Sequence, residues 1–274
     1  MRRQPHLACR AAARYHGDTM TELPDIHQRD RQTGRVRDPE AHAREVRGMF
    51  ARISGVYDRM NHLLSLNLDR QWRRRLAAHL PPSTGTLLDL CAGTGDLGLT
   101  CLAQGRCREV LAVDFVPEML AGIAGKEGAA RVTAIAGDGL RLPLPDASVD
   151  AVVAGFGVRN LADPAAGACE MARVLRPGGK ALVLEFFRAD PAARGAARGP
   201  VAPVRWVLGK ALPAVGRVVA RDQAAYSYLP GSMDRFLGVD EYLAVLRDAG
   251  FDGGFAERMT LGVAHLVGGV KAGA

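Results

Sequence analysis

The residues with the clearest chemical meaning lie in segment 87–98, which reads LLDLCAGTGDLG. An apolar run leads to Asp89, and a glycine turn with Gly93 and Gly95 follows before a segment of helical character. A buried strand that passes through a glycine-rich turn into a helix allows a ligand to approach bare backbone. We therefore expect a cofactor at this turn, with Asp89, Gly93 and Gly95 among its contacts.

Two cofactor classes compete for the turn. The glycines at positions 93, 95 and 98 match the dinucleotide pattern G-x-G-x-x-G. However, Asp89, Asp96 and Asp114 lie near the turn, and carboxylates repel a pyrophosphate but attract a cation. S-adenosylmethionine carries a sulfonium and an ammonium and has no phosphate, so we expect it as the cofactor. Asp114 ends the next apolar run, where an acidic residue accepts ribose hydroxyls of either cofactor.

Length and composition indicate one large domain with a tail and an insertion. The chain has 274 residues, of which 48% are hydrophobic and 24% charged, as in an ordinary globular protein. No apolar run approaches the roughly 18 residues of a membrane-spanning helix. The five cysteines show no metal-binding spacing, so we expect no metal site. Their odd number, without a secretory signal, predicts reduced thiols in a cytoplasm.

The net charge of +7 is unevenly distributed. Residues 1–37 carry eight arginines and four acidic residues, whereas the rest of the chain is only mildly basic. We therefore expect no nucleic-acid partner, although a nucleic-acid-binding module is the non-enzymatic alternative. A second basic zone at residues 44–75 predicts attraction to an anionic membrane surface. The alternative there is a solvated helix face.

The chain divides into a tail and one domain. Residues 1–40 lack periodicity, so we expect a disordered basic tail. Residues 41–274 form the expected catalytic domain, which begins with a helical cap at 41–80. In the cap, Val46, Phe50 and Tyr57 lie on one apolar stripe. Residues 190–237 are rich in Pro, Gly, Arg and Ala, and we interpret them as an insertion.

From residue 86 onward, short apolar runs alternate with helical ones. We expect strands at 86–91, 109–114, 131–136, 149–155, 180–187, 251–257 and 262–271, and helices at 96–104, 117–126, 164–175 and 239–249. This alternation favours a parallel sheet covered by helices on both faces. Segment 176–179, Arg-Pro-Gly-Gly, predicts a turn between a helix and a strand.

Six segments resemble, in order, the ubiquinone/menaquinone C-methyltransferases over about residues 44–271. They are YDRMN at 57–61, LDLCAGTGD at 88–96, LPLPD at 142–146, FGVRN at 156–160, RVLRPGG at 173–179 followed by LEF at 184–186, and YSYLP at 226–230. The glycine turn, the LPLPD segment and the RPGG turn are common among class I methyltransferases. The YDRMN, FGVRN and YSYLP segments are much more specific to this family.

This resemblance implies an α/β fold of the class I S-adenosylmethionine-dependent methyltransferases. That fold is Rossmann-like, with a mostly parallel seven-stranded sheet, one antiparallel strand and helices on both faces. The implied reaction is C-methylation of a polyprenylated quinol, which for menaquinone is 2-demethylmenaquinol. A benzoquinol precursor of ubiquinone, and a different small or lipid acceptor, stay open as alternatives. An NAD-dependent oxidoreductase is a third enzymatic hypothesis.

The resemblance also assigns cofactor contacts by matching position. These contacts are Thr94, Asp114, Asp138, Gly139 and Gly155. The chain departs from the family pattern at three positions. Asp69 replaces a frequent His, Asn67 a frequent Gly and Gly155 a frequent Ser, and the last change removes a hydroxyl.

Methyl transfer to carbon requires in-line positioning of a nucleophile. The acceptor carbon becomes nucleophilic as the neighbouring quinol hydroxyl loses its proton. Arg159 and Asn160 follow the fourth strand at its carboxyl end, where ligands of parallel sheets bind. We expect Arg159 to stabilise the phenolate and Asn160 to orient the ring hydroxyl; the alternative for Arg159 is a loop arginine paired to a carboxylate. Asp58 is the second candidate proton acceptor. Tyr57 and Asp58 are expected to close over the cofactor, and Tyr57 is also a candidate substrate contact; the alternatives are core packing for Tyr57 and a helix cap for Asp58.

The remaining expectations concern the apolar tail of the acceptor. Tyr226 and Tyr228 are expected to line the acceptor pocket, or else only to anchor the insertion. Apolar residues between 201 and 219 are expected to cover the tail, with a homodimer contact or packing on the sheet as alternatives. Each buried methylene contributes about 0.8 kcal/mol, so the tail dominates affinity. We therefore expect a cytoplasmic enzyme that works at the inner face of the plasma membrane.

Overall fold

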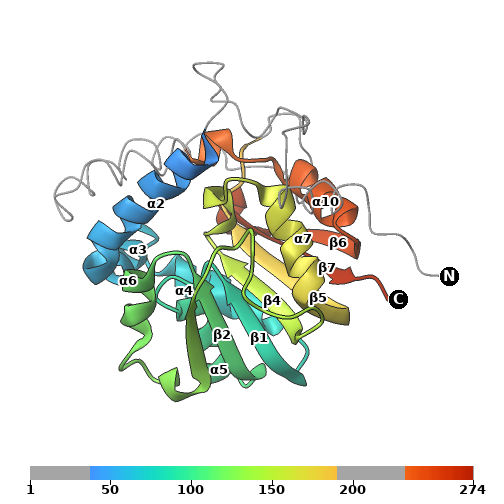
Figure 1. Ribbon diagram of the computed structural model, residues 1–274, viewed down its shortest axis with the longest axis horizontal. Helices are drawn as coiled ribbons and strands as arrows, with labels where there is room; N and C mark the ends of the chain where they lie inside the picture. The colour runs from blue at the N-terminus through green and yellow to red at the C-terminus, as the bar shows by residue number, and fades with distance from the viewer. Residues whose placement is uncertain (1–37, 190–231, 274) are drawn as a thin grey trace.

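A computed structural model describes residues 38–189 and 232–273 of the chain. In this part of the chain, seven strands form one sheet with helices packed on both faces (Figure 1). The strands are β1 (Thr84–Leu90), β2 (Cys107–Asp114), β3 (Val132–Ala136), β4 (Val149–Gly155), β5 (Leu175–Glu185), β6 (Phe251–Met259) and β7 (Ala264–Lys271). All seven predicted strands are therefore present.

The sheet has the order β3-β2-β1-β4-β5-β7-β6. Strands β1 to β5 pair in parallel, whereas β7 runs antiparallel to both β5 and β6. The mostly parallel sheet with one antiparallel strand is thus confirmed. The strand order reverses between β1 and β4, which is the point where open α/β sheets bind ligands beyond the carboxyl ends of their strands.

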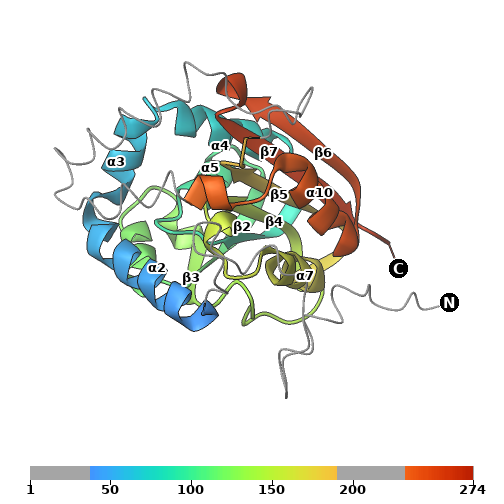
Figure 2. The same cartoon turned by 90° about the horizontal axis from the view of Figure 1, so that it is seen from above.

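Alternating side chains of β1 bury against different helices. Leu88 and Leu90 pack in the cluster that contains residues of α7 (Pro164–Val174) and α10 (Val239–Asp248). Leu87 packs on the other face, with residues of α4 (Leu68–Ala78) and α5 (Asp96–Ala103). Figures 1 and 2 show these two helical layers on opposite sides of the sheet.

The cap is helical, as predicted, but it is divided into separate helices. It consists of α2 (Pro39–Ile53), the 3-10 turn η2 (Ser54–Val56), α3 (Tyr57–Leu64) and α4. Helix α2 begins at Pro39 because Asp38 caps it, accepting the backbone N–H groups of Glu40 and Ala41. Between α3 and α4, Leu66 and Asn67 have positive φ angles of 52° and 60°, which end the helix.

One predicted helix and one predicted turn differ from the structure, and the helix comes first along the chain. The helix predicted at 117–126 stops early as α6 (Pro117–Leu120) and the 3-10 turn η3 (Ala121–Ile123), with η4 (Ala129–Arg131) following. Gly122 packs directly against Thr94 there, so the chain bends back toward the glycine turn.

The turn predicted at 176–179 lies within β5 as a bulge. Leu175 pairs with Val149 and Lys180 pairs with Ala151, so four residues loop out between these two pairs. Gly178 supplies the positive φ angle of 78° that the bulge needs. The strand therefore begins directly after α7. Two further 3-10 turns, η5 (Val158–Asn160) and η7 (Thr260–Gly262), follow β4 and β6.

Candidate active site

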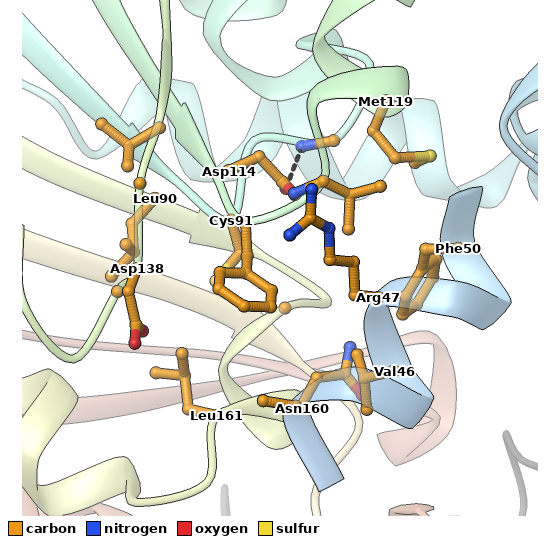
Figure 3. A pocket seen from close by; sticks show the side chains of 18 of the residues that line it. Val46, Arg47, Phe50, Leu90, Cys91, Asp114, Met119, Asp138, Asn160 and Leu161 are labelled. Atoms are coloured by element: carbon orange, nitrogen blue, oxygen red, sulfur yellow. Dashed lines mark hydrogen bonds between the residues drawn. The ribbon is translucent and has the colours of Figure 1, made fainter. Parts of the chain in front are cut away.

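A cavity of about 450 Å³ lies between α2 and the carboxyl ends of the central strands. This volume is typical of a small-molecule site. Figure 3 shows Asp114 and Asp138 on one side and Arg47 and Phe50 of α2 on the other. The cavity therefore lies where the strand order reverses, and the helical cap covers it.

The glycine turn uses its own backbone donors. Ala92 N–H donates to Val113 O at 3.1 Å, and Gly95 N–H donates to Ala92 O at 2.9 Å. Gly93 N–H donates to the Asp114 carboxylate at 2.7 Å. A dinucleotide site needs such N–H groups to face a pyrophosphate. Because these three are already occupied, the turn fits a cofactor without phosphate better than it fits a dinucleotide.

Asp114 is placed to bind hydroxyl groups. It ends β2 and lines the cavity, and its two oxygens accept N–H groups from Gly93 and Val116. Each carboxylate oxygen keeps a further lone pair for a ligand hydroxyl. Burial raises the pKa of Asp114, and the backbone donors oppose that shift by favouring the charged form. Asp114 and Asp138 give the strand side of the cavity wall an acidic character that suits a cationic cofactor with ribose hydroxyls, whereas Arg44 and Arg47 line the α2 side.

Asp89 has a structural position instead of the predicted cofactor contact. It lies on the face of β1 that packs against α5, and it accepts the Gly98 N–H in the first turn of that helix at 2.8 Å. Its other carboxylate oxygen has no hydrogen-bond partner among the described residues. Burial raises its pKa to about 7. The alternation of strand side chains directs Asp89 away from the cavity, while its neighbour Leu90 lines it.

Thr94 and Asp58 form part of an ion-pair network beside the cavity. The Thr94 hydroxyl donates to Asp58 at 2.5 Å, and Lys126 Nζ donates to Asp58 at 2.6 Å, to Asp96 at 2.8 Å and to Thr94 O at 3.0 Å. Neither Asp58 nor Thr94 is among the residues that line the cavity. Asp58 therefore joins α3 to the glycine turn, and its carboxylate is engaged by a cation. Gly95 also lies outside the cavity wall, because it forms the N-cap of α5.

Arg159 does not face the cavity. Its guanidinium is buried and pairs with Glu185, also buried, at 2.7 Å, and it donates to Phe156 O as well. The backbone N–H of Arg159 donates to the other oxygen of Glu185 at 3.2 Å. Burial raises the pKa of Glu185, and Arg159 opposes that shift. The alternative interpretation, a loop arginine paired to a carboxylate, describes what the structure shows.

Other predicted residues do reach the cavity. Tyr57 and Asn160 line it, as do Gly93, Gly139 and Gly155. The Tyr57 ring packs edge-on against Phe50, with centroids 5.8 Å apart, and so holds α3 against α2.

Gly155 stands where the family often has serine, and the structure shows where a side chain at this position would point. A Cβ added to Gly155 would lie 3.2 Å from Leu97 Cδ2, so a side chain there points toward α5. Gly155 therefore presents its backbone to the cavity. Tyr226 and Tyr228 lie outside the described residues, so the acceptor contacts predicted for them stay predictions.

Sequence reasoning missed the strained turns after β1 and β4. Cys91 and Phe156 line the cavity with positive φ angles of 54° and 60°, which are rare for residues other than glycine. Such conformations cluster at functional sites. Gly157 is required here, because a Cβ on it would collide with Cys91. The two central strands therefore end in turns that touch one another under the cavity.

Residues of α2 were also missed as cavity residues. The sequence pattern identifies Val46 and Phe50 only as part of an apolar stripe, and Arg47 only as part of a basic zone. The Arg47 guanidinium lies over the Phe115 ring, 5.6 Å from its centre. Their membership in the cavity depends on how the cap folds over the sheet (Figure 3). Glu185 is the carboxylate of the LEF segment at 184–186. A carboxylate within an apolar strand predicts a buried, positively charged partner.

Within the described residues, no group of three or more His, Cys, Asp or Glu side chains is arranged to hold a metal ion. The sheet order, the glycine turn and the acidic cavity wall define a class I S-adenosylmethionine-dependent methyltransferase. The chain belongs to the ubiE/COQ5 methyltransferase family, whose model matches residues 38–271.

Curated relatives match along most of the chain. A demethylmenaquinone methyltransferase of Deinococcus radiodurans is 39% identical and covers 86% of this chain and 96% of its own length. A demethylmenaquinone methyltransferase of Thermus thermophilus is 40% identical, and the match covers 80% of this chain and 97% of the relative. The ubiquinone/menaquinone biosynthesis C-methyltransferase UbiE of Caulobacter sp. strain K31 is 36% identical, with 86% and 92% covered.

Solved structures share the fold at low identity. A S-adenosylmethionine-dependent methyltransferase of Thermotoga maritima, described as a possible histamine N-methyltransferase, aligns with a TM-score of 0.57 and 17% identity, covering 82% of this chain and 99% of that one. The [4+2]-cyclase SpnF aligns with a TM-score of 0.60 and 16% identity, covering 85% and 97%. At this identity the likeness concerns the fold alone.

The first prediction concerns Asp114. In Asp114→Ala, the carboxylate that would accept ligand hydroxyls is lost, so affinity for S-adenosylhomocysteine should fall by at least about tenfold. Isothermal titration calorimetry measures this change. Asp252→Ala, at an exposed position of β6, should leave the affinity unchanged. Equal affinities in the two variants would contradict the assignment.

The second prediction concerns the Arg159–Glu185 pair. Arg159→Met leaves the Glu185 carboxylate buried without its counter-charge and should lower the free energy of unfolding by about 3–5 kcal/mol. The double variant Arg159→Met/Glu185→Gln should recover most of that loss, because no buried charge is left unpaired. Urea unfolding measures both. If the single variant kept full stability and lost only turnover, a direct catalytic role for Arg159 would be supported instead.

The third prediction concerns the pH dependence of stability at Asp89. Its folded-state pKa of about 7 exceeds the ordinary 3.8, so the folded state binds more protons between these values. Stability due to this group is therefore present below pH 4 and is lost as the pH rises through 7. The Asp89→Asn variant cannot titrate at this position. The difference in free energy of unfolding between the variant and the native chain should therefore shift in favour of the variant by up to roughly 4 kcal/mol from pH 4 to 8. Urea unfolding across this range tests the prediction, and a constant difference would refute it.

Proposed function

We propose that this methyltransferase C-methylates a polyprenylated quinol in quinone biosynthesis, with 2-demethylmenaquinol as the acceptor. One observation carries the proposal: two family-specific segments far apart in sequence bring Tyr57 and Asn160 into the same cavity as Asp114. The names of the relatives from Deinococcus radiodurans and Thermus thermophilus support the menaquinone step. The UbiE relative supports the alternative that a benzoquinol precursor of ubiquinone is also accepted.

The chain's own residues account for cofactor binding. When bound, S-adenosylmethionine supplies an electrophilic methyl group on a positively charged sulfur. Asp114 would accept its ribose hydroxyls, while Asp138 and Gly139 form the neighbouring wall of the cavity. Gly93 and Gly155 present bare backbone to the same space. The acidic wall stabilises positive charge, since unlike charges attract most strongly where water is scarce.

The acceptor residues lie across the cavity from Asp114. Asn160 would hydrogen-bond the ring hydroxyl and so orient the carbon beside it. Arg159 holds the turn that carries Asn160, because it binds Glu185 and Phe156 O on the far side. We therefore assign Arg159 a positioning role in place of direct phenolate stabilisation. Asp58, engaged by Lys126 and Thr94, is assigned to joining the cap to the glycine turn.

The acceptor's tail determines where the reaction takes place. A single isoprene unit, at about 0.8 kcal/mol per buried methylene, contributes roughly 4 kcal/mol of affinity. A substrate with such a tail resides in a bilayer, so the enzyme would act at the cytoplasmic face of the membrane. No described helix is long and apolar enough to span a bilayer. Acceptor contacts by Tyr226 and Tyr228, and assembly into a homodimer, belong to the same proposal.

The test is a turnover assay with labelled S-adenosylmethionine. The native chain should transfer label to 2-demethylmenaquinol, and mass spectrometry should place one added methyl group on the naphthoquinol ring. Asn160→Ala should lower kcat by about 100-fold through misplacement of the acceptor, with unchanged affinity for S-adenosylhomocysteine. Arg108→Gln, exposed near the start of β2, is the matched control. Label on a benzoquinol alone would favour the ubiquinone alternative, and label on neither quinol would refute the proposal.

A further inference from the structure

Two leucines combine strong exposure with a strained backbone. Leu66 is 79% exposed with a φ angle of 52°, and Leu261 is 63% exposed with a φ angle of 57°. The left-handed region is unfavourable for a branched L-residue, and an exposed leucine recovers no burial free energy in the isolated chain. Such outliers persist where the fold enforces them, and they cluster at functional positions.

The two leucines belong to segments that are joined in space. Leu66 lies in the turn before α4, one residue ahead of the N-cap Asn67, and Leu261 lies in η7 after β6. Trp72 of α4 donates its indole N–H to the Thr260 hydroxyl at 2.8 Å, which ties these segments together. Figure 2 shows α4 and the end of β6 on the same side of the molecule. With Leu63, which is 48% exposed at the end of α3, these leucines form what we call the leucine edge: Leu63, Leu66 and Leu261.

Two arginines of α4 follow the turn that carries Leu66. Arg70 and Arg74 are exposed and spaced by one helical turn on α4. The Arg70 N–H donates to Asn67 O, so this arginine follows the Leu66 turn directly. Among the described residues, neither arginine has a carboxylate partner, whereas the neighbouring Arg75 pairs with Glu257 at 2.7 Å. Protruding apolar side chains beside unpaired arginines match the interface of an anionic bilayer.

An aromatic cluster connects the leucine edge with the cavity. The ring centroids of Trp72 and Phe156 lie 6.0 Å apart, and Phe156 lines the cavity. Phe156 in turn stacks on Phe186, with ring centroids 4.6 Å apart. The wall between the cavity and the edge is therefore apolar. A bilayer at this edge would lie next to the site that needs a lipid acceptor.

We propose that the leucine edge docks this methyltransferase on an anionic bilayer. Leu66 and Leu261 insert among the lipid headgroups, and Arg70 and Arg74 contact lipid phosphates. The biological role of this docking rests on the proposed function, because a polyprenylated acceptor must be taken from a membrane. The physical interaction itself depends only on the exposed leucines and arginines.

The test uses the full chain and the double variant Leu66→Asn/Leu261→Asn. Asparagine tolerates the left-handed region, so the variant should keep or raise its thermal midpoint while it loses the apolar tips. Cosedimentation with phosphatidylglycerol/phosphatidylcholine vesicles should show at least tenfold weaker binding for the variant. Arg70→Gln/Arg74→Gln should also weaken binding and should reduce its dependence on salt. Arg108→Gln, at the amino end of β2 and so at the opposite end of the sheet from η7, should bind as the native chain does.

Three outcomes would overturn the docking role: a native chain that does not bind vesicles, a double variant that binds them equally well, or a leucine edge that mediates self-association. The last would appear in sedimentation velocity as a native oligomer that the double variant loses, without vesicle binding. Turnover of a short-chain, water-soluble demethylnaphthoquinol should be equal in the native chain and the variant. If neither the native chain nor the variant methylates detergent-solubilised 2-demethylmenaquinol, the proposed function fails, and vesicle binding is still judged separately.

Discussion

The site depends on two carboxylates that hold the backbone after β1. Asp114 accepts the Gly93 N–H, and Asp89 accepts the Gly98 N–H at the start of α5. Asp114 comes from the end of β2 and Asp89 from β1 itself, so carboxylates of two neighbouring strands fix the turn and the start of the helix that follows it. The turn is thus shaped by the protein before any ligand arrives. The N–H groups of Ala92, Gly93 and Gly95 are used internally, so these three offer no donors to a ligand phosphate.

Cations tie the cap to this turn: Arg73 of α4 lies 3.4 Å from Asp96, and Lys126 makes shorter contacts. Lys126 bridges Asp58 of α3 with Asp96 and the Thr94 carbonyl of the turn, each within 3.0 Å. Tyr57, next to Asp58, packs on Phe50 of α2, so the same connection continues into the helix that covers the cavity. In a low local dielectric, the hydrogen bonds of such a network polarise and strengthen one another. The cavity's floor and roof are therefore parts of one connected structure.

Arg159 illustrates the limit of reasoning from residue type. Its place after β4 was correctly predicted to lie at the ligand-binding end of the sheet. Its side chain turns to the buried Glu185, a partner 26 residues away that no local pattern specifies. A buried carboxylate without a counter-charge is costly, and that demand sets the direction of the guanidinium. Asn160, the adjacent residue, is left to line the cavity.

The sequence by itself determined the strands and the glycine turn after β1, because hydrophobic periodicity and turn chemistry act over a few neighbouring residues. The family followed from the six segments that resemble the ubiquinone/menaquinone C-methyltransferases. The sequence also brought Asp114, Asp138 and Asn160 to one edge of the sheet, since parallel strands end together. Tertiary structure alone decided which face each side chain takes. It turned Asp89 toward α5, shortened α6 so that Lys126 reaches Asp58, and laid α2 over the cavity. These outcomes depend on packing and charge pairing between segments far apart in the chain, which local patterns do not encode.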